Sequence, residues 1–210
     1  MQHLTYEYAR RGACLLIIAR RENLLKKVAE KAGKLGSPDV VPLCADVLKV
    51  DDRKRKSLMN LFSVDVLVNN AGIGSMCLIE DVTDITKLAP VMASKAALLG
   101  FFETMRVELA PEISITTATL GIIESEITKG KHLSKEGTTQ VNSDLANAYA
   151  NQLPVMSSSA CAKVIVDAIR RKERNVTEPK WYRVLFLLKT LCPELIEWGY
   201  DPEMELRYKA

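Results

Sequence analysis

The chain has 210 residues with 29 basic and 26 acidic side chains, which gives a formal net charge of +3. A charge this balanced gives no reason to expect a nucleic-acid partner. Hydrophobic residues make up 48% and charged residues 26% of the chain, a composition that excludes a disordered protein and suits one large domain or two small ones.

Helical and strand-like patterns alternate along the first third of the chain. Residues 13–19 (ACLLIIA) are almost wholly apolar, as in a strand that is buried on both faces of a parallel sheet. Residues 22–35 follow with apolar side chains at helical spacing, and Gly36 then ends that helix. Similar patterns predict helices at 1–11 and 51–61 and strands at 40–47 and 64–68.

The second half of the chain continues the alternation. We predict a helix at 93–109, a β-branched strand at 113–120 (ISITTATL) and another helix at 161–171. Residues 129–159 are polar with weak periodicity, which predicts a mobile excursion with one short helix. Strands and helices that alternate at this spacing predict an α/β fold, a doubly wound parallel sheet with helices on both faces.

The cysteines and histidines give no sign of a disulfide framework or a metal centre. The five cysteines are widely scattered and contain no C-x-x-C pair, so we expect reduced thiols in a reducing compartment. Neither His3 nor His132 has a cluster of Cys, Asp or Glu at ligand spacing. The sequence therefore predicts no metal site.

The ends of the predicted strands are where a doubly wound sheet binds its ligands. Arg20 and Arg21 follow the first strand, where an acidic residue would accept hydrogen bonds from the ribose 2′-hydroxyl of NAD. A cation at that place would instead meet a 2′-phosphate, so the pair favours NADP. The alternative is that Arg20 is a solvated charge at the start of the next helix.

Two further strand ends carry candidate cofactor contacts. Asp46 follows the second strand, and its carboxylate could accept from an adenine amino group, although an ordinary turn-forming role is the alternative. The third strand runs into Asn69-Asn70-Ala71-Gly72, where Ala71 and Gly72 permit a close approach of the backbone to a ligand. Each of these signals is weak alone, but their order along the chain is specific.

Taken in order, the segments ARRENL, CADV, VLVNNAGI and ASKAAL resemble the short-chain dehydrogenase/reductase family. The resemblance is closest to the 11β-hydroxysteroid dehydrogenase-like group, which includes the plant steroleosins. Residues 120–128 (LGIIESEIT) are similar to the PG-x-x-x-T segment of the family, and residues 174–198 are similar to its C-terminal region. The resemblance runs from Tyr6 to Trp198 and implies an NADP(H)-dependent oxidoreductase of hydroxysteroids or other lipophilic alcohols and ketones.

The family mechanism places a tyrosine four residues before a lysine on one face of a helix. The tyrosine exchanges a proton with the substrate oxygen, and the lysine anchors the nicotinamide ribose and lowers the pKa of the tyrosine. By this resemblance Lys95 is the catalytic lysine and also a cofactor ligand, beside Asn69, Ala71, Gly72 and Ser125. Two alternatives stay open, because Lys95 could be a solvated helix charge and Ser125 could be a helix N-cap before Glu126.

The chain departs from the family pattern at the catalytic helix. The residue four positions before Lys95 is Val91, which has no ionisable proton. The chain also passes from Gly72 to Lys95 in 23 positions. That is too few for the helix and strand that the family places there, since a βαβ unit takes about 30 residues. We infer an internal deletion that removes the catalytic tyrosine, the serine and a strand.

A second departure lies at the start of the chain. The first residues resemble the middle of the helix that follows the glycine-rich turn of the family, and no G-x-x-x-G-x-G segment occurs. We therefore expect an incomplete Rossmann-like sheet that lacks the first strand and the strand before the catalytic helix. The expected organisation is a partial NADP-binding domain over residues 1–175 and an amphipathic C-terminal extension over 176–210.

Two functions follow from these observations. The first is an NADP(H)-dependent oxidoreductase with a steroid-like substrate, impaired in this chain; the second is a non-catalytic isoform that pairs with intact relatives. The resemblance implies the endoplasmic reticulum membrane or a lipid droplet, although a chain without the apolar anchor of the group could be cytosolic. Residues 181–198 could cover the substrate pocket, pair with another subunit as a homo- or heterodimer, or lie on a membrane. The basic run 53–56 is expected to be a solvated helix face rather than a phosphate site.

Overall fold

The computed structural model describes residues 2–46, 49, 63–72, 85–126, 128–129, 131–133, 139–141 and 155–195. The chain forms two compact units. The first comprises residues 1–74 and 158–167, and the second comprises residues 75–157 and 168–210. The helix predicted at 51–61 and the basic run at 53–56 lie outside the described residues.

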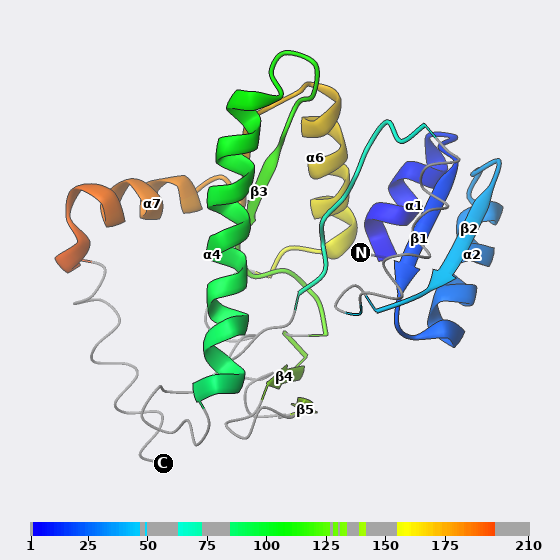
Figure 1. Ribbon diagram of the computed structural model, residues 1–210, viewed down its shortest axis with the longest axis horizontal. Coiled ribbons are helices and arrows are strands. Elements are labelled where there is room, and N and C mark those ends of the chain that lie inside the picture. Colours follow the sequence, from blue (N-terminus) through cyan, green and yellow to red (C-terminus); the bar gives the residue numbers. More distant parts are fainter. Residues whose placement is uncertain are drawn as a thin grey trace. The chain divides into compact units, whose positions relative to one another are not determined.

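The first unit contains a βαβ element (Figure 1). Helix α1 (Gln2–Arg10) leads into strand β1 (Leu15–Ala19), and helix α2 (Glu22–Lys34) connects β1 to strand β2 (Val40–Cys44). The two strands are parallel, with Leu15 opposite Val40 and Ala19 opposite Cys44. The parallel pairing and the connecting helix confirm the βαβ prediction for this part of the chain.

Two glycines end the helices of this unit. Gly12 follows α1 with φ of 74°, and Gly36 follows α2 with φ of 114°, a backbone region that disfavours residues with a side chain. Next to Gly36, the Ser37 hydroxyl lies 2.6 Å from the carbonyl oxygen of Ala13 and 3.0 Å from that of Asp39. These short bonds connect the entrances of β1 and β2 and so support their register.

The core of the first unit lies between α1 and α2. Tyr6, Ala9 and Ala32 are buried there, and partly buried apolar side chains pack against them: Leu15, Val28, Leu35 and Val40. Strand β1 itself buries only Ile17, so the prediction of a strand buried on both faces is wrong. The physical reason is that the described sheet has two strands, which leaves the faces of β1 incompletely covered.

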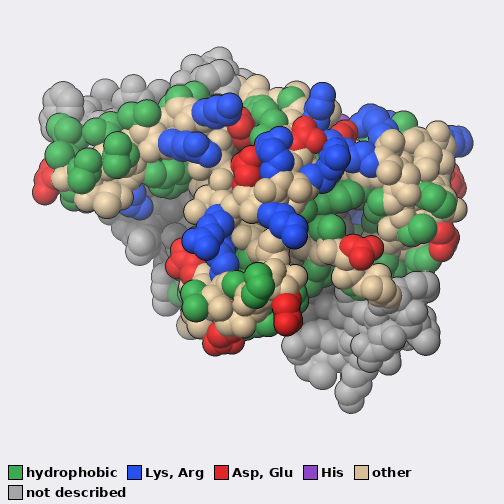
Figure 2. All heavy atoms as spheres, turned by 90° about the horizontal axis from the view of Figure 1, so that it is seen from above, with side chains coloured by type: hydrophobic (Ala, Val, Ile, Leu, Met, Phe, Trp, Pro, Cys, Tyr) green, Lys and Arg blue, Asp and Glu red, His purple; other side chains and the backbone are tan. Residues whose placement is uncertain are grey.

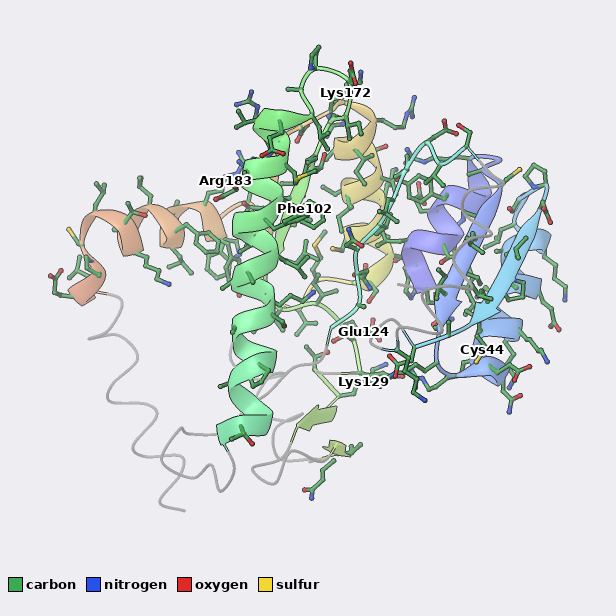
Figure 3. The ribbon with its side chains drawn as sticks, in the orientation of Figure 1. Cys44, Phe102, Glu124, Lys129, Lys172 and Arg183 are labelled. Atoms are coloured by element: carbon green, nitrogen blue, oxygen red, sulfur yellow. The ribbon has the colours of Figure 1, made fainter. Side chains whose placement is uncertain are left out.

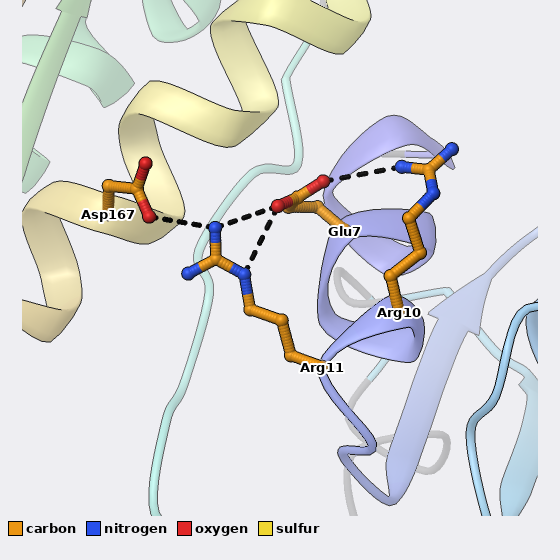
Figure 4. A network of polar contacts seen from close by, with 4 residues as sticks. All are labelled: Glu7, Arg10, Arg11 and Asp167. Carbon is orange, nitrogen blue, oxygen red and sulfur yellow. Dashed lines mark hydrogen bonds and ion pairs between the residues drawn. The ribbon is translucent and has the colours of Figure 1, made fainter.

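Helix α6 (Ser158–Arg170) contributes its first ten residues to the first unit. Its buried side chains in this part are small or aliphatic: Cys161, Ala162, Ile165 and Val166. Arg11, just after α1, connects the two segments, because its Nη2 atom lies 2.7 Å from Glu7 Oε1 and 2.8 Å from Asp167 Oδ1 (Figure 4). Glu7 also receives a weaker contact of 3.3 Å from Arg10.

The prediction of a third strand at 64–68 is wrong, because these residues form no strand in the structure. In the strand order 3-2-1-4-5-6 of a doubly wound sheet, strand 4 pairs with strands 1 and 5. Strands β1 and β2 fit neighbouring positions 2 and 3 of that order, and residues 64–68 fit position 4. Neither partner for position 4 is among the described residues, so the backbone at 64–68 has no ladder and Leu67 is 64% exposed.

The second unit contains another pair of parallel strands. Strand β3 (Thr117–Leu120) pairs with strand β6 (Asn175–Glu178), with Thr117 opposite Asn175 and Leu120 opposite Glu178. Helix α4 (Ile85–Glu108) precedes β3, and helix α7 (Tyr182–Leu191) follows β6 (Figure 1). Strands β4 (Lys131–Leu133) and β5 (Thr139–Val141) form a short antiparallel pair.

Several sequence predictions need correction in this unit. The strand predicted at 113–120 begins only at Thr117, and β6 was not predicted although Val176 and Thr177 favour strands. The excursion at 129–159 contains the β4–β5 pair, and the helix that its described residues contain is the start of α6, at Ser158. The helix predicted at 93–109 begins eight residues earlier, because α4 runs from Ile85 straight through Pro90.

The fold is therefore α/β with parallel strands, an incomplete Rossmann-like arrangement. Of the cysteines that the structure describes, Cys161 is buried, whereas Cys14, Cys44 and Cys192 are exposed free thiols. The described part of the chain contains no helix that is long and apolar enough to cross a bilayer.

Candidate functional site

Three of the residues predicted to contact the cofactor lie at the carboxyl edge of the β1–β2 pair. Arg20 and Arg21 follow β1 directly, and Asp46 comes two residues after the end of β2. The backbone holds this edge together, since the Ala45 amide donates to the Ala19 carbonyl at 3.1 Å and the Cys44 thiol lies 3.5 Å from the Arg20 carbonyl (Figure 3). The fold thus places both arginines and Asp46 on the edge where doubly wound sheets bind ligands.

The two arginines are exposed and differ in their backbone role. Arg21 is the N-cap residue of α2, and its carbonyl accepts the Leu25 amide at 2.9 Å, but its side chain makes no capping hydrogen bond. A guanidinium carries only donors, so it could not cap the N–H groups of the helix start. Positive charge next to a helix N-terminus is unfavourable for the helix and favourable for an anion bound there. This arrangement suits a phosphate ligand, and the assignment of Arg20 and Arg21 to NADP stays a prediction.

The first turn of α2 contains a neighbouring ion pair. Lys26 Nζ lies 2.7 Å from Glu22 Oε1, and both side chains are more than half exposed. The hydrogen bond with Lys26 holds the pKa of Glu22 below its usual value, and that with Glu22 raises the pKa of Lys26. The charge of Glu22, the residue directly after Arg21, is therefore compensated by Lys26 of the same helix.

Asp46 and the 69–72 segment have less defined geometry. Asp46 is half-buried, and its carbonyl accepts the Lys49 amide at 3.1 Å, as in a turn. Asn69, Ala71 and Gly72 are exposed and lie in a stretch without regular structure, where the Asn70 amide donates to the Val68 carbonyl at 3.2 Å. The bond at Asp46 agrees with the alternative of an ordinary turn-forming residue. Contact of Asp46 and of residues 69–72 with a nucleotide stays a prediction.

Lys95 lies on α4, in the second unit, and its side chain is exposed. The position four residues before it, where the family mechanism needs a proton donor, holds Val91. Both residues belong to one uninterrupted helix, so their i, i+4 relationship places the two positions on the same face. The face that carries the ribose-binding lysine in the family therefore offers no ionisable group at the donor position.

Ser125 lies in a tight turn after β3. Its amide donates to Thr128 Oγ1 at 2.8 Å, and its hydroxyl oxygen accepts the Thr128 amide at 3.3 Å. An ion pair of 3.1 Å between Glu124 and Lys129 closes the same turn (Figure 3). This reciprocal pattern is that of a helix N-cap, yet the described residues here form a turn and no helix. The local bonding gives Ser125 a structural role in this turn, and its assignment to a cofactor stays a prediction.

One contact at the carboxyl edge of the β3–β6 pair was not predicted from the sequence. The Gly121 amide donates to the Glu178 carbonyl at 2.7 Å, which extends the sheet by one bond. The ring of Tyr182 lies directly against Gly121, and Tyr182 in turn stacks on Trp181 with ring centroids 4.2 Å apart. The glycine of the LGIIESEIT segment was the available signal, because such a residue often marks a close approach.

Comparison with known proteins agrees with the fold and the order of these segments. The sequence profile of the family described as short chain dehydrogenase matches residues 2–92. The 11-beta-hydroxysteroid dehydrogenase 1A of Arabidopsis thaliana is 43% identical over 245 residues, which covers 94% of this chain and 70% of that protein. The 11-beta-hydroxysteroid dehydrogenase A of Arachis hypogaea is 40% identical, covering 95% of this chain and 70% of that protein. The chain belongs to the short-chain dehydrogenase/reductase family and is related to these plant hydroxysteroid dehydrogenases.

Solved structures share the fold at low sequence identity. A short-chain type dehydrogenase/reductase from Mycobacterium marinum matches with a TM-score of 0.68 and 18% identity, over 86% of this chain and 90% of that chain. A short-chain dehydrogenase from Sphingobium yanoikuyae, solved in complex with NADPH, matches with a TM-score of 0.65 and 17% identity, over 93% and 90% of the two chains. These similarities support the Rossmann-like assignment.

The comparisons also bear on the inferred deletion. The alignment with the Arabidopsis protein extends over 245 residues, more than the 210 residues of this entire chain. Several tens of residues of the relative therefore have no counterpart here, inside the aligned region. The family profile ends at Met92, beside the junction between Val91 and the ASKAAL segment. The place of these residues stays a prediction, the deletion inferred just before Lys95.

Proposed function

We propose that this chain is an NADP(H)-linked member of the hydroxysteroid dehydrogenase group whose own turnover is impaired. The lineage implies substrates that are hydroxysteroids or other lipophilic alcohols and ketones. Support comes from the identity to plant proteins named 11-beta-hydroxysteroid dehydrogenase and from two arginines at the carboxyl edge of β1. One observation supports the impairment: Val91 occupies the position four residues before Lys95 on the continuous helix α4.

Different residues of this chain would bind different parts of a nicotinamide cofactor. Arg20 and Arg21 would pair with a 2′-phosphate, and Asp46 would accept from the adenine. The backbone at Asn69, Ala71 and Gly72 would pass close to the nucleotide, and the ammonium of Lys95 would donate to the ribose. When bound, the cofactor supplies the hydride.

Proton transfer is the step that this chain does not support. Reduction of a ketone needs a proton at the new hydroxyl oxygen, and oxidation of an alcohol needs a base for the same proton. Val91 can do neither. Lys95 could orient a ribose but would have no tyrosine whose pKa it could lower, so a loss of several orders of magnitude in turnover is expected.

The test separates cofactor binding from turnover. Purified chain is titrated with NADPH and NADH by fluorescence, and NADPH consumption is followed with a ketosteroid. We expect NADPH to bind more tightly than NADH, and this preference to disappear in Arg20→Glu/Arg21→Glu. Turnover is expected to stay at the level of the Lys95→Ala variant. Steady turnover that survives Lys95→Ala would show that this account of the site is wrong.

A second function is favoured by the exposed segment at 64–68. Four large apolar side chains are exposed in a stretch that has no regular structure and no strand partner among the described residues: Val64, Val66, Leu67 and Val68. Such a segment is a template for pairing with another chain. A non-catalytic chain could act in this way, by association with an intact relative.

Association is tested by mixing the chain with the recombinant Arabidopsis 11-beta-hydroxysteroid dehydrogenase 1A and separating the mixture by size. A heteromeric complex that Leu67→Asp abolishes supports this second function. Leu24→Asp serves as a control, because Leu24 is an exposed leucine on another element, α2. Absence of a complex with the unsubstituted chain contradicts it.

A further inference from the structure

The outer edge of strand β2 is blocked against further strands. The parallel register places Pro42 of β2 opposite Ile17 of β1. In this register Ile17 bonds to the residues on either side of Pro42, so the backbone of Pro42 is directed away from β1. Pro42 is exposed, and a proline has no amide hydrogen that it could donate to another strand. It therefore protects the outer edge of β2, as prolines do on natural edge strands.

The outer edge of strand β1 has no such protection. The Leu15 amide and the Ala19 carbonyl, at the two ends of β1, both bond to residues next to β2, over 2.8 Å and 3.1 Å. Every second residue of β1 thus bonds toward β2, and the residues between them, Leu16 and Ile18, direct their backbone groups to the opposite side. The described part of the chain offers no strand on that side. We call this row of groups at Leu16 and Ile18 the open edge of β1.

Residues 64–68 have the composition of a strand that would fit the open edge. Their sequence, VDVLV, is as long as β1 and has a β-branched residue at every second position. Their apolar side chains are exposed, and hydrophobic side chains at the surface of the first unit are visible at the right of Figure 2. In the doubly wound order, β1 at position 2 and residues 64–68 at position 4 are the two neighbours of position 1. Each segment therefore lacks a partner on the side that would face the other.

The side-chain pattern indicates which backbone groups of residues 64–68 would face β1. Leu15 packs against the core between α1 and α2, and Ile17, two residues later, is buried on the same face of the strand. In a parallel sheet, residues whose side chains share a face also direct their backbone groups to the same side. If the three valines of residues 64–68 occupy that apolar face, their backbone groups point toward β1. Those of Asp65 and Leu67 then point away from it.

We propose that residues 64–68 of one copy pair in parallel with the open edge of β1 in a second copy, and that the exchange is reciprocal. The two segments do not pair within one chain, and each supplies the hydrogen-bonding groups that the other needs. Reciprocal exchange closes a two-fold dimer, whereas one-way exchange would build open filaments. This inference depends neither on cofactor binding nor on association with a relative, although that association would use the same residues 64–68.

Sedimentation velocity of the full chain at several concentrations detects the dimer, and hydrogen exchange followed by NMR at low and high concentration locates the interface. We expect a concentration-dependent dimer in which the amides of Leu16, Ile18 and Val66 exchange more slowly than in the monomer. The Leu67 amide should show no such change. A chain that stays monomeric at the highest concentration overturns the proposal, and so do filaments in place of a closed dimer. A dimer without protection at Leu16 and Ile18 also overturns it, because its interface lies elsewhere.

Val66→Pro and Leu67→Pro are matched variants, since each places a proline in a stretch without regular structure. Val66→Pro removes an amide that is directed at β1, and it should raise the dissociation constant of the dimer about tenfold or more, because a symmetric dimer loses two hydrogen bonds. Leu67→Pro removes an amide that is directed away and should have a much smaller effect. Equal weakening by the two prolines would contradict strand pairing.

A synthetic peptide of residues 63–69 provides a test without any substitution in the chain. Excess peptide should occupy the open edge and convert the dimer into monomers. The same peptide with an N-methyl group on the Val66 amide should fail to do so, whereas N-methylation of the Leu67 amide should be tolerated. A dimer that neither the plain peptide nor the Leu67-methylated peptide dissociates would show that residues 64–68 do not hold the two copies together.

Discussion

The ring of Tyr182 lies so close to Gly121 that no side chain fits at position 121. A Cβ atom built there would come within 2.6 Å of Cζ and 2.9 Å of Cδ2 of the tyrosine. Such distances do not occur between non-bonded carbon atoms in folded proteins. The contact joins the end of β3 to the start of α7, and therefore fixes the position of α7 relative to the β3–β6 sheet.

Gly121→Ala is expected to displace the Tyr182 ring and loosen α7. Overpacking of this kind costs about 1–3 kcal/mol of unfolding free energy. Trypsin should then cleave at Arg183 or Lys189 faster than in the unsubstituted chain, and urea denaturation should show the loss of stability.

Gly100→Ala is the matched control, since a Cβ atom at Gly100 meets nothing within 4 Å. Gly100 lies in the interior of α4, where alanine is preferred to glycine by about 0.5–1 kcal/mol. This variant should be slightly more stable and should leave cleavage in α7 unchanged. Equal destabilisation by both substitutions would contradict the packing argument.

Arg11 is the polar connection between α1 and α6, and its removal should be costly. Its side chain is 23% exposed and donates to both Glu7 and Asp167. Hydrogen bonds to these two carboxylates raise the pKa of the guanidinium. Arg11→Ala should lower the free energy of unfolding by about 2 kcal/mol, because a hydrogen bond between charged partners contributes about 1.5–3 kcal/mol.

Arg10→Ala tests whether the effect depends on geometry or on charge alone. Arg10 is 52% exposed and makes one longer contact of 3.3 Å with Glu7. Exposed pairs contribute little, so this variant should change stability by less than about 0.5 kcal/mol. Urea denaturation of the two variants side by side gives the comparison, and similar losses would refute a specific role for Arg11.

The first unit was largely predictable from the sequence because its signals are local. The apolar run at Leu15–Ala19 and the helical spacing at 22–34 each define an element within a few residues. Gly12 and Gly36 mark the ends of helices through their own backbone preference. The place of Arg20, Arg21 and Asp46 just after two strands was predictable as well, and the structure pairs these strands in parallel. Their role toward a cofactor stays a prediction.

The errors concern residues whose structure depends on distant partners. The segment at 64–68 has the composition of a strand, but a strand exists only where another strand accepts its hydrogen bonds. Strand β6 was missed because four residues carry little periodicity, and its pairing with β3 joins residues far apart in the sequence. The start of α4 was placed too late because the prediction rested on the helical pattern at 93–109, while the helix begins at Ile85 and continues through Pro90.

Ionisation of Tyr8 is expected to lower the free energy of unfolding at alkaline pH. Its hydroxyl oxygen is buried and has no hydrogen-bond partner among the described residues, and burial raises the pKa of this phenol above 10.0. The unfolded chain thus loses the Tyr8 proton at a lower pH than the folded chain does. Stability is fully retained below about pH 10 and falls as pH rises from there through the higher folded pKa.

Tyr8→Phe should remove that share of the alkaline loss and raise stability at neutral pH by about 1 kcal/mol, since an unsatisfied buried hydroxyl is removed. Tyr6→Phe is the control. The Tyr6 hydroxyl accepts from Gln2 at 2.9 Å, so its loss should lower stability. Urea titrations near pH 8 and near pH 11 measure both effects. Identical pH profiles for Tyr8→Phe and the unsubstituted chain would show that Tyr8 does not cause the dependence.

Removing each hydroxyl of the turn at Ser125 separates a structural role of Ser125 from a role in cofactor binding. The two variants are Thr128→Ala and Ser125→Ala. Thr128 Oγ1 accepts the Ser125 amide and lies 3.0 Å from the Ile123 carbonyl, whereas Ser125 Oγ accepts the Thr128 amide at the longer distance of 3.3 Å. If the turn is purely structural, Thr128→Ala should destabilise more than Ser125→Ala, by about 1 kcal/mol, because it leaves more polar groups unpaired. NADPH affinity, measured by fluorescence titration, should then be unchanged in Ser125→Ala. A several-fold loss of NADPH affinity in Ser125→Ala, with stability retained, would instead assign the hydroxyl to the cofactor.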